Sequence, residues 1–100
     1  MMVIQDVMAA LSEAAGPVVK VLVKGDHSKV IVLGFKKGMT LREHQTAVTT
    51  RLVVIEGQVN YFSADGNVMM NKFDDLEIPV NVPHSVQALD ESICFLIQGS

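Results

Sequence analysis

Residues 38–46 read Gly-Met-Thr-Leu-Arg-Glu-His-Gln-Thr, and residues 79–84 read Pro-Val-Asn-Val-Pro-His. Each segment carries one histidine and adjoins short apolar runs of the kind that form strands. Strict alternation along the first segment predicts one face made of Thr40, Arg42, His44 and Thr46. If the two histidines face a common cavity, these segments mark the most evident site in the chain.

Short apolar runs separated by turn signals continue on both sides of these segments. Gly25-Asp26-His27-Ser28 and Ser63-Ala64-Asp65-Gly66 are clusters that favour turns. The expected strands cover residues 18–23, 30–33, 40–46, 52–55, 58–62, 68–70, 76–78, 86–88 and 93–97. About nine short strands with frequent turns predict an all-β antiparallel sandwich or barrel, and a jelly roll protects its sheet edges at this size.

The N-terminal residues follow a helical pattern instead. Residues 3–14 are apolar at positions 3, 4, 7, 8 and 11, and Gly16-Pro17 ends the pattern. We expect a short helix over one sheet; the alternative is that Met1, Met2 and Met8 pack across a dimer or cap a barrel mouth. The chain is therefore expected to be one domain, residues 1–100, with an N-terminal helical segment at 1–16 and a β-barrel at 17–98.

Composition limits the classes of partner. The net charge is −3 and the basic residues form no stripe, so we expect neither nucleic acid nor a membrane as the partner. A single cysteine, Cys94, and no Lys or Arg among the first 19 residues favour a cytoplasmic protein without a signal peptide. A hydrophobic fraction of 49% in 100 residues favours a homodimer that covers part of the apolar surface.

The two histidine segments resemble the paired motifs of the cupin family. The first motif is G-x5-H-x-H-x3-E-x6-G, and Gly38, His44 and Gly57 stand at its spacings. The second is G-x5-P-x-G-x2-H-x3-N, and Pro79 and His84 match it. The chain thus resembles a small single-domain cupin of the conserved-barrel, RmlC-like jelly-roll type. This implies a cupin double-stranded β-helix (a jelly-roll barrel) with a short N-terminal helix.

The metal motif is incomplete. The second histidine of the first motif falls on Thr46 and its glutamate on Thr50. The resemblance implies a divalent metal held by His44 and His84, and Zn, Ni, Mn and Fe are all open because imidazole selects weakly among them. The alternative is two pocket histidines that hydrogen-bond to the threonines or to water. The two glycines of the second motif fall on Phe73 and Asn81, and its asparagine falls on Ala88. Asparagine tolerates positive φ at position 81, whereas a phenylalanine at position 73 predicts that the turn there has moved or changed type.

Two classes of function are open. The first hypothesis is a cupin barrel of unassigned activity that binds a small-molecule ligand, either without a metal or beside a weakly held divalent metal. The alternative is a metal-dependent enzyme of the dioxygenase, isomerase or decarboxylase type. The expected ligand pocket consists of Arg42, His44, Thr46, Thr50 and His84. Arg42 either clamps a ligand carboxylate or phosphate or extends to solvent. His27 is expected in a solvated turn, and Cys94 is expected to be buried and unreactive.

Overall fold

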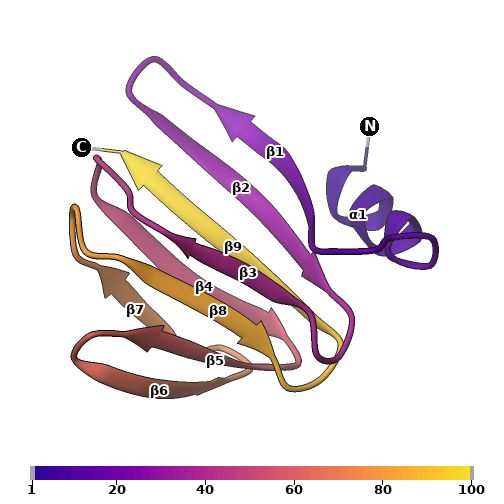
Figure 1. The fold of residues 1–100 in the computed structure, drawn as a ribbon. Helices are drawn as coiled ribbons and strands as arrows, with labels where there is room; N and C mark the ends of the chain where they lie inside the picture. The colour runs from indigo at the N-terminus through magenta and orange to yellow at the C-terminus, as the bar shows by residue number, and fades with distance from the viewer. Residues whose placement is uncertain (1, 100) are drawn as a thin grey trace.

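Two antiparallel sheets lie face to face in the computed structural model of the chain, which describes residues 2–99 (Figure 1). The five-stranded sheet has the order β1-β2-β9-β4-β7 and the four-stranded sheet the order β3-β8-β5-β6. The elements are α1 (Val3–Leu11), β1 (Val18–Lys24), β2 (Ser28–Phe35), β3 (Thr40–His44), β4 (Thr50–Glu56), β5 (Gln58–Ser63), β6 (Gly66–Asn71), β7 (Asp75–Ile78), β8 (His84–Ala88) and β9 (Ser92–Gly99). The predicted jelly-roll fold, with one short N-terminal helix followed by short strands, is confirmed.

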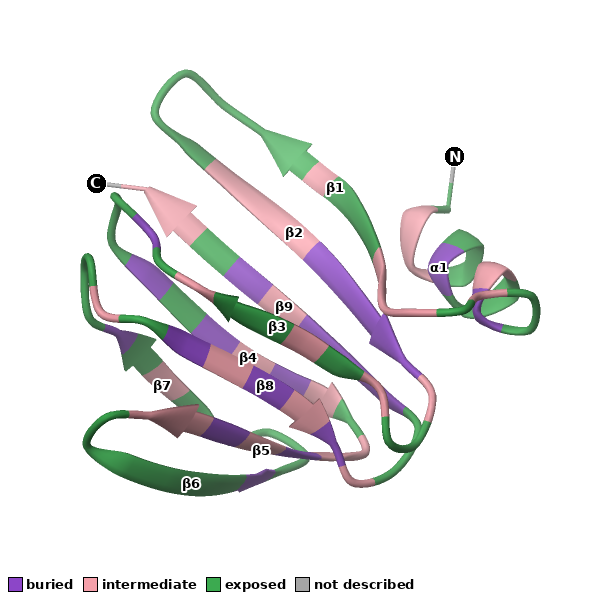
Figure 2. Cartoon of the chain, viewed as in Figure 1, coloured by how far each residue is buried: buried purple, intermediate pink, exposed green. Residues whose placement is uncertain are grey.

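The core lies between the two sheets and is mainly aliphatic (Figure 2). Alternation places every second residue of a strand on the inner face. The buried core cluster comprises Leu33, Phe35, Leu52, Val54, Val59, Tyr61, Met70, Ile78, Val86, Ala88, Cys94 and Leu96. The prediction that Cys94 is buried is confirmed, and burial raises the pKa of its thiol to about 12, which favours the expected lack of reactivity.

Helix α1 covers the outer face of the larger sheet near β1 and β2. Its buried residues Val7 and Leu11 pack with Val32 and Ile93 in a second apolar cluster. A Cβ on Gly34 would collide with the side chain of Val7, so glycine is required where the helix approaches β2. The prediction of a helix over one sheet is confirmed. Its alternative rested partly on Met1, which lies outside the described residues. No helix within residues 2–99 is long and apolar enough to cross a membrane.

Two non-glycine residues adopt the left-handed conformation that glycine favours. Asn81 has φ 61°, in line with the tolerance expected of asparagine. Phe73 has φ 73°, and its side chain is 73% exposed. The turn at Phe73 therefore keeps a glycine-like backbone, and the expectation that it has moved or changed type is wrong. The ammonium of Lys72 lies 5.2 Å from the Phe73 ring centroid, over its face.

Strand β3 contains a bulge that breaks the predicted alternation. Leu41 pairs with Val86 and His44 with His84, so two residues of β3 stand opposite one residue of β8. The extra residue brings both Leu41 and His44 to the inner face, although they are three positions apart. Arg42 and Glu43 between them are exposed. The predicted shared face of positions 40, 42, 44 and 46 is therefore wrong for this strand.

Candidate functional site

His44 and His84 lie directly opposite each other on the adjacent strands β3 and β8. Their ring centroids are 4.2 Å apart, and the ring planes are tilted by 57°. His84 is 1% exposed, whereas His44 is half-buried. The bulge in β3 and the start of β8 thus bring together the two histidines that the sequence pointed to.

The two imidazoles make the same backbone hydrogen bond. His44 Nδ1 lies 2.9 Å from the Arg42 carbonyl oxygen, and His84 Nδ1 lies 3.1 Å from that of Val82. A carbonyl oxygen only accepts, so Nδ1 carries the proton in both neutral rings and each Nε2 is left with a lone pair. Burial lowers the pKa of His84 and the neighbouring His44 lowers it further, against the opposing effect of the Val82 carbonyl. The deeper imidazole is therefore held neutral, as an acceptor.

Tyr61 of β5 adds a third polar group that the sequence analysis missed. Its ring stacks against His84 with 5.7 Å between centroids and 23° between planes. Tyr61 is 5% exposed, and its hydroxyl has no hydrogen-bond partner among the described residues. Burial, with a smaller effect from Asp65, raises the pKa of this phenol, which stays protonated as a donor. Val59 and Tyr61 are two positions apart on one strand and so share a face, and this spacing could have indicated that Tyr61 points inward.

Thr46 and Thr50 replace the missing metal ligands in sequence, and both are buried. Their hydroxyls donate to the same acceptor, the Val48 carbonyl oxygen, at 3.2 Å and 3.0 Å. These bonds close the loop between β3 and β4. The two threonines are therefore loop-forming side chains, and neither hydrogen-bonds to a histidine within residues 2–99.

A cleft of about 430 Å³ opens between the two sheets beside this loop. Its volume falls within the range of small-molecule sites. His44 and Thr46 line it, whereas His84 and Thr50 lie outside its lining. Arg42 is exposed on the outer side of the bulge and does not line the cleft. Of the five residues expected in the pocket, two face the cleft, two are buried near it and one points away. His27 is exposed in the turn between β1 and β2, as predicted.

The donor set does not fit a resident metal ion. Catalytic zinc takes three protein ligands and leaves one position open. Within residues 2–99, no group of three or more His, Cys, Asp or Glu side chains lies close enough together to hold a metal. His44 and His84 offer two neutral nitrogens without a carboxylate to balance the charge of the ion, and the hydroxyls of Thr46 and Thr50 are directed to a backbone carbonyl.

Solved structures with the same fold come from several bacteria. A cupin superfamily protein from Desulfitobacterium hafniense superposes with a TM-score of 0.79 at 15% identity, over 85% of this chain and 78% of that one. An RmlC-like cupin from Desulfovibrio desulfuricans gives 0.77 at 21% identity, over 84% and 82%. A cupin 2 conserved barrel domain protein from Leptotrichia buccalis gives 0.77 at 25% identity, over 86% of this chain and 42% of that one. No protein-family model matches the chain, and no curated protein matches it in sequence.

Proposed function

We propose that this chain, which has the fold of the cupins, binds a small organic molecule in the cleft between its two sheets, against His44. The observation that carries the proposal is the pair of imidazoles with both Nδ1 atoms bonded to the backbone and both Nε2 atoms without a partner in the described chain. The hydroxyl of Tyr61, whose ring stacks on His84, is buried without a partner among the described residues, and a buried group of this kind is costly unless a ligand or water satisfies it.

The chemistry of His44 defines what the ligand offers, because His44 is the one of the three groups that lines the cleft. Its Nε2 lone pair accepts a hydrogen bond, so it favours a ligand hydroxyl or amide N–H. His84 and Tyr61 lie behind His44 as seen from the cleft, because neither lines it. We therefore infer that the ligand contacts His44 directly and that His84 and Tyr61 support it from the core.

A screen of small polar metabolites by nuclear magnetic resonance tests this proposal. A true ligand is expected to shift the ring signals of His44 and to lose affinity in His44→Ala. His27→Ala is the matched control, because His27 is an exposed histidine in a turn. Binding that survives His44→Ala, or that is equally weakened by His27→Ala, would place the ligand elsewhere and contradict the proposal.

The alternative is a metal-dependent enzyme of the dioxygenase, isomerase or decarboxylase type. The backbone bonds at both Nδ1 atoms are the observation in its favour, because such bonds commonly fix metal-binding histidines. Metal analysis of protein purified without an affinity tag separates the two functions. Stoichiometric Zn, Ni, Mn or Fe that disappears in His44→Ala and His84→Ala would favour the enzyme. Metal-free protein with no thermal shift on adding these ions would exclude it.

We also propose that two copies of the chain form a homodimer, in the cytoplasm. Strand β1 is an edge strand of the larger sheet, and its residues Val19, Val21 and Val23 are each about half exposed. An apolar edge strand is a surface on which sheets associate. Light scattering is expected to give twice the chain mass of 10.9 kDa for the native protein and the single mass for the double variant Val19→Asp/Val21→Asp. A monomeric native protein would contradict this proposal.

A further inference from the structure

The lining of the 430 Å³ cleft has an uneven chemical character. Most of it is aliphatic, with Ile31, Leu33 and Leu96 from the larger sheet and Leu41 from the smaller one. Among the described residues, the lining includes one charged side chain, Lys29, and no Asp or Glu. The cleft is therefore an apolar groove with a single positive charge at one end of β2.

The backbone explains why Lys29 faces the cleft. Strand β2 places Lys29, Ile31 and Leu33 on the same face by alternation, and Leu33 belongs to the buried core. Lys29 pairs across the sheet with Gln98 of β9, which also lines the cleft. A lysine ammonium and an amide thus stand next to each other at the edge of an aliphatic wall.

Lys29 makes no ion pair within residues 2–99, in contrast to Lys72 and Arg51, which pair with Glu56 and Asp75. It is half-buried, so its stem lies on the apolar wall and its charge lies near a region of low dielectric. A charge in such a place attracts an anion more strongly than one in open solvent. Lys29 also borders a neighbouring cavity of about 250 Å³, whose lining includes the acidic residue Asp26.

We propose that the cleft selects a monocarboxylate with an apolar body, held by Lys29 and Gln98 at the carboxylate and by Ile31, Leu33, Leu41 and Leu96 along the body. This inference rests on the proposed small-molecule function and names the ligand class. The ammonium and the amide N–H groups donate to the carboxylate oxygens, as charge-assisted bonds in which Lys29 acts as the counter-ion. The Nε2 atom of His44 accepts a bond from a donor on the ligand body, and it does not hold the carboxylate.

Three probes with one apolar body and different head groups test the proposal: hexanoate, 1-hexanol and hexylamine. Titrations of the full chain are followed through the methyl signals of the cleft leucines and isoleucine. Hexanoate is expected to bind more tightly than the other two. Lys29→Met is expected to weaken hexanoate binding by about tenfold, the value of one hydrogen bond to a charged group, and to leave 1-hexanol unaffected. Lys29→Arg is expected to keep most of the affinity.

Two control variants separate the local charge from the net charge. Lys37→Met removes an exposed lysine at the other end of the barrel and is expected to leave hexanoate binding unchanged. Asp26→Asn removes the acidic neighbour and is expected to leave it unchanged or to strengthen it. Equal binding of the three probes, or equal effects of Lys29→Met and Lys37→Met, would overturn the carboxylate assignment. If 1-hexanol still bound and required His44, the proposed small-molecule function would stand. Failure of all three probes to perturb the cleft would count against both.

Discussion

The two ends of the barrel differ in how their polar groups are satisfied. At the end formed by the turn between β4 and β5, Ser92 is fully buried, accepts from the Gln58 N–H at 3.1 Å and lies 2.7 Å from the Asp90 carbonyl oxygen. At the other end, His44 and His84 bond to backbone only through Nδ1, and the Tyr61 hydroxyl has no partner in the described chain. The Ser92 hydroxyl at one end has its partners within the chain, while the Tyr61 hydroxyl at the other has none among the described residues.

This difference separates structure from function within one small domain. A buried polar group without a partner costs free energy, so a protein keeps one where something outside the chain completes it. The closed end gains stability from the hydrogen bonds of the buried Ser92 hydroxyl and from glycine turns such as Gly57, at φ 87°. The open end gives up some stability by burying a phenol without a partner in the described chain, and it presents one imidazole, His44, and one lysine, Lys29, at an apolar cleft. Substitutions at the two ends are therefore expected to act in opposite directions.

Gly57→Ala is expected to give the largest effect, at the closed end. Gly57 has a positive φ, and a Cβ there would collide with the Glu91 carbonyl oxygen and the Ser92 hydroxyl. Backbone strain and the collision together are expected to lower the free energy of unfolding by about 3 kcal/mol. Gly38→Ala is the matched control, because Gly38 has φ 88° with open space around its Cα, and strain alone predicts a loss of about 1 kcal/mol. Urea unfolding of both variants measures the difference, and equal losses would show that the turn is not tightly packed.

Tyr61→Phe is expected to stabilise the free protein, at the open end. The substitution removes a buried hydroxyl that lacks a partner and leaves the ring stacked on His84. The free energy of unfolding is expected to rise by about 1 kcal/mol, because the desolvation cost of the hydroxyl disappears. Val59→Ala serves as a control at a buried position of the same strand and is expected to destabilise. A loss of stability in Tyr61→Phe would mean that ordered water already satisfies the hydroxyl and that the end is less open than its hydrogen bonds suggest.

The strands could be predicted from the sequence, because alternation and turn residues act locally. The pattern of Val, Ile and Leu located each strand to within a few residues, and Gly38 and Gly57, which matched the motif spacing, both have positive φ. At the open end, the direction in which a side chain points depends on strand register, and register is set by pairing between strands that are distant in sequence. One extra residue in β3 turns His44 inward and Arg42 outward, and no feature of residues 40–46 announces it.

The partners of the site residues were equally hard to infer from sequence. Tyr61 was missed, and although alternation along its strand could have placed it inward, its lack of a hydrogen-bond partner depends on which strands surround it. Thr46 and Thr50 were expected near the histidines, yet their hydroxyls bond to the Val48 carbonyl within their own loop. The alternation of Lys29 with Ile31 and Leu33 was present in the sequence and becomes meaningful only once a cleft is seen beside it.

The buried imidazole of His84 predicts a pH dependence of stability that arises at the open end. Burial lowers the pKa of His84 below its ordinary value of 6.5, so the unfolded chain takes up a proton more readily than the folded one. The free energy of unfolding is therefore expected to fall as the pH drops below about 6.5, until the lowered pKa is passed. His84→Gln keeps a donor for the Val82 carbonyl without titrating, and it is expected to flatten this part of the profile. Thermal unfolding between neutral and acidic pH measures it, and an unchanged slope in His84→Gln would assign the dependence to other groups.

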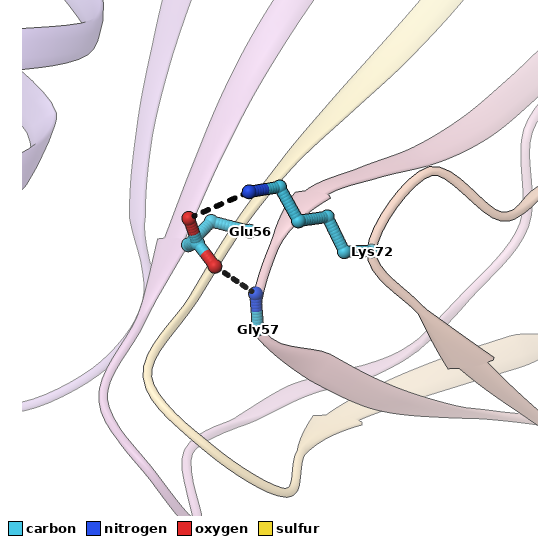
Figure 3. A network of polar contacts seen from close by, with 3 residues as sticks. All are labelled: Glu56, Gly57 and Lys72. Atoms are coloured by element: carbon cyan, nitrogen blue, oxygen red, sulfur yellow. Dashed lines mark hydrogen bonds and ion pairs between the residues drawn. The ribbon is translucent and has the colours of Figure 1, made fainter.

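The smallest effect is expected from the ion pair on the surface of the closed end. Lys72 Nζ lies 3.4 Å from Glu56 Oε2, and Glu56 Oε1 accepts from the Gly57 N–H at 3.3 Å (Figure 3). Both charged side chains are at least half exposed, so water and salt screen the pair. Lys72→Ala is expected to change the free energy of unfolding by less than about 0.5 kcal/mol, and the difference should shrink as salt is added. Lys37→Ala is the control for removing an exposed lysine. Lys72→Ala could instead lower the free energy of unfolding about as much as Gly57→Ala does. The closed end would then depend on its exposed charges, and this result would contradict the comparison of the two ends.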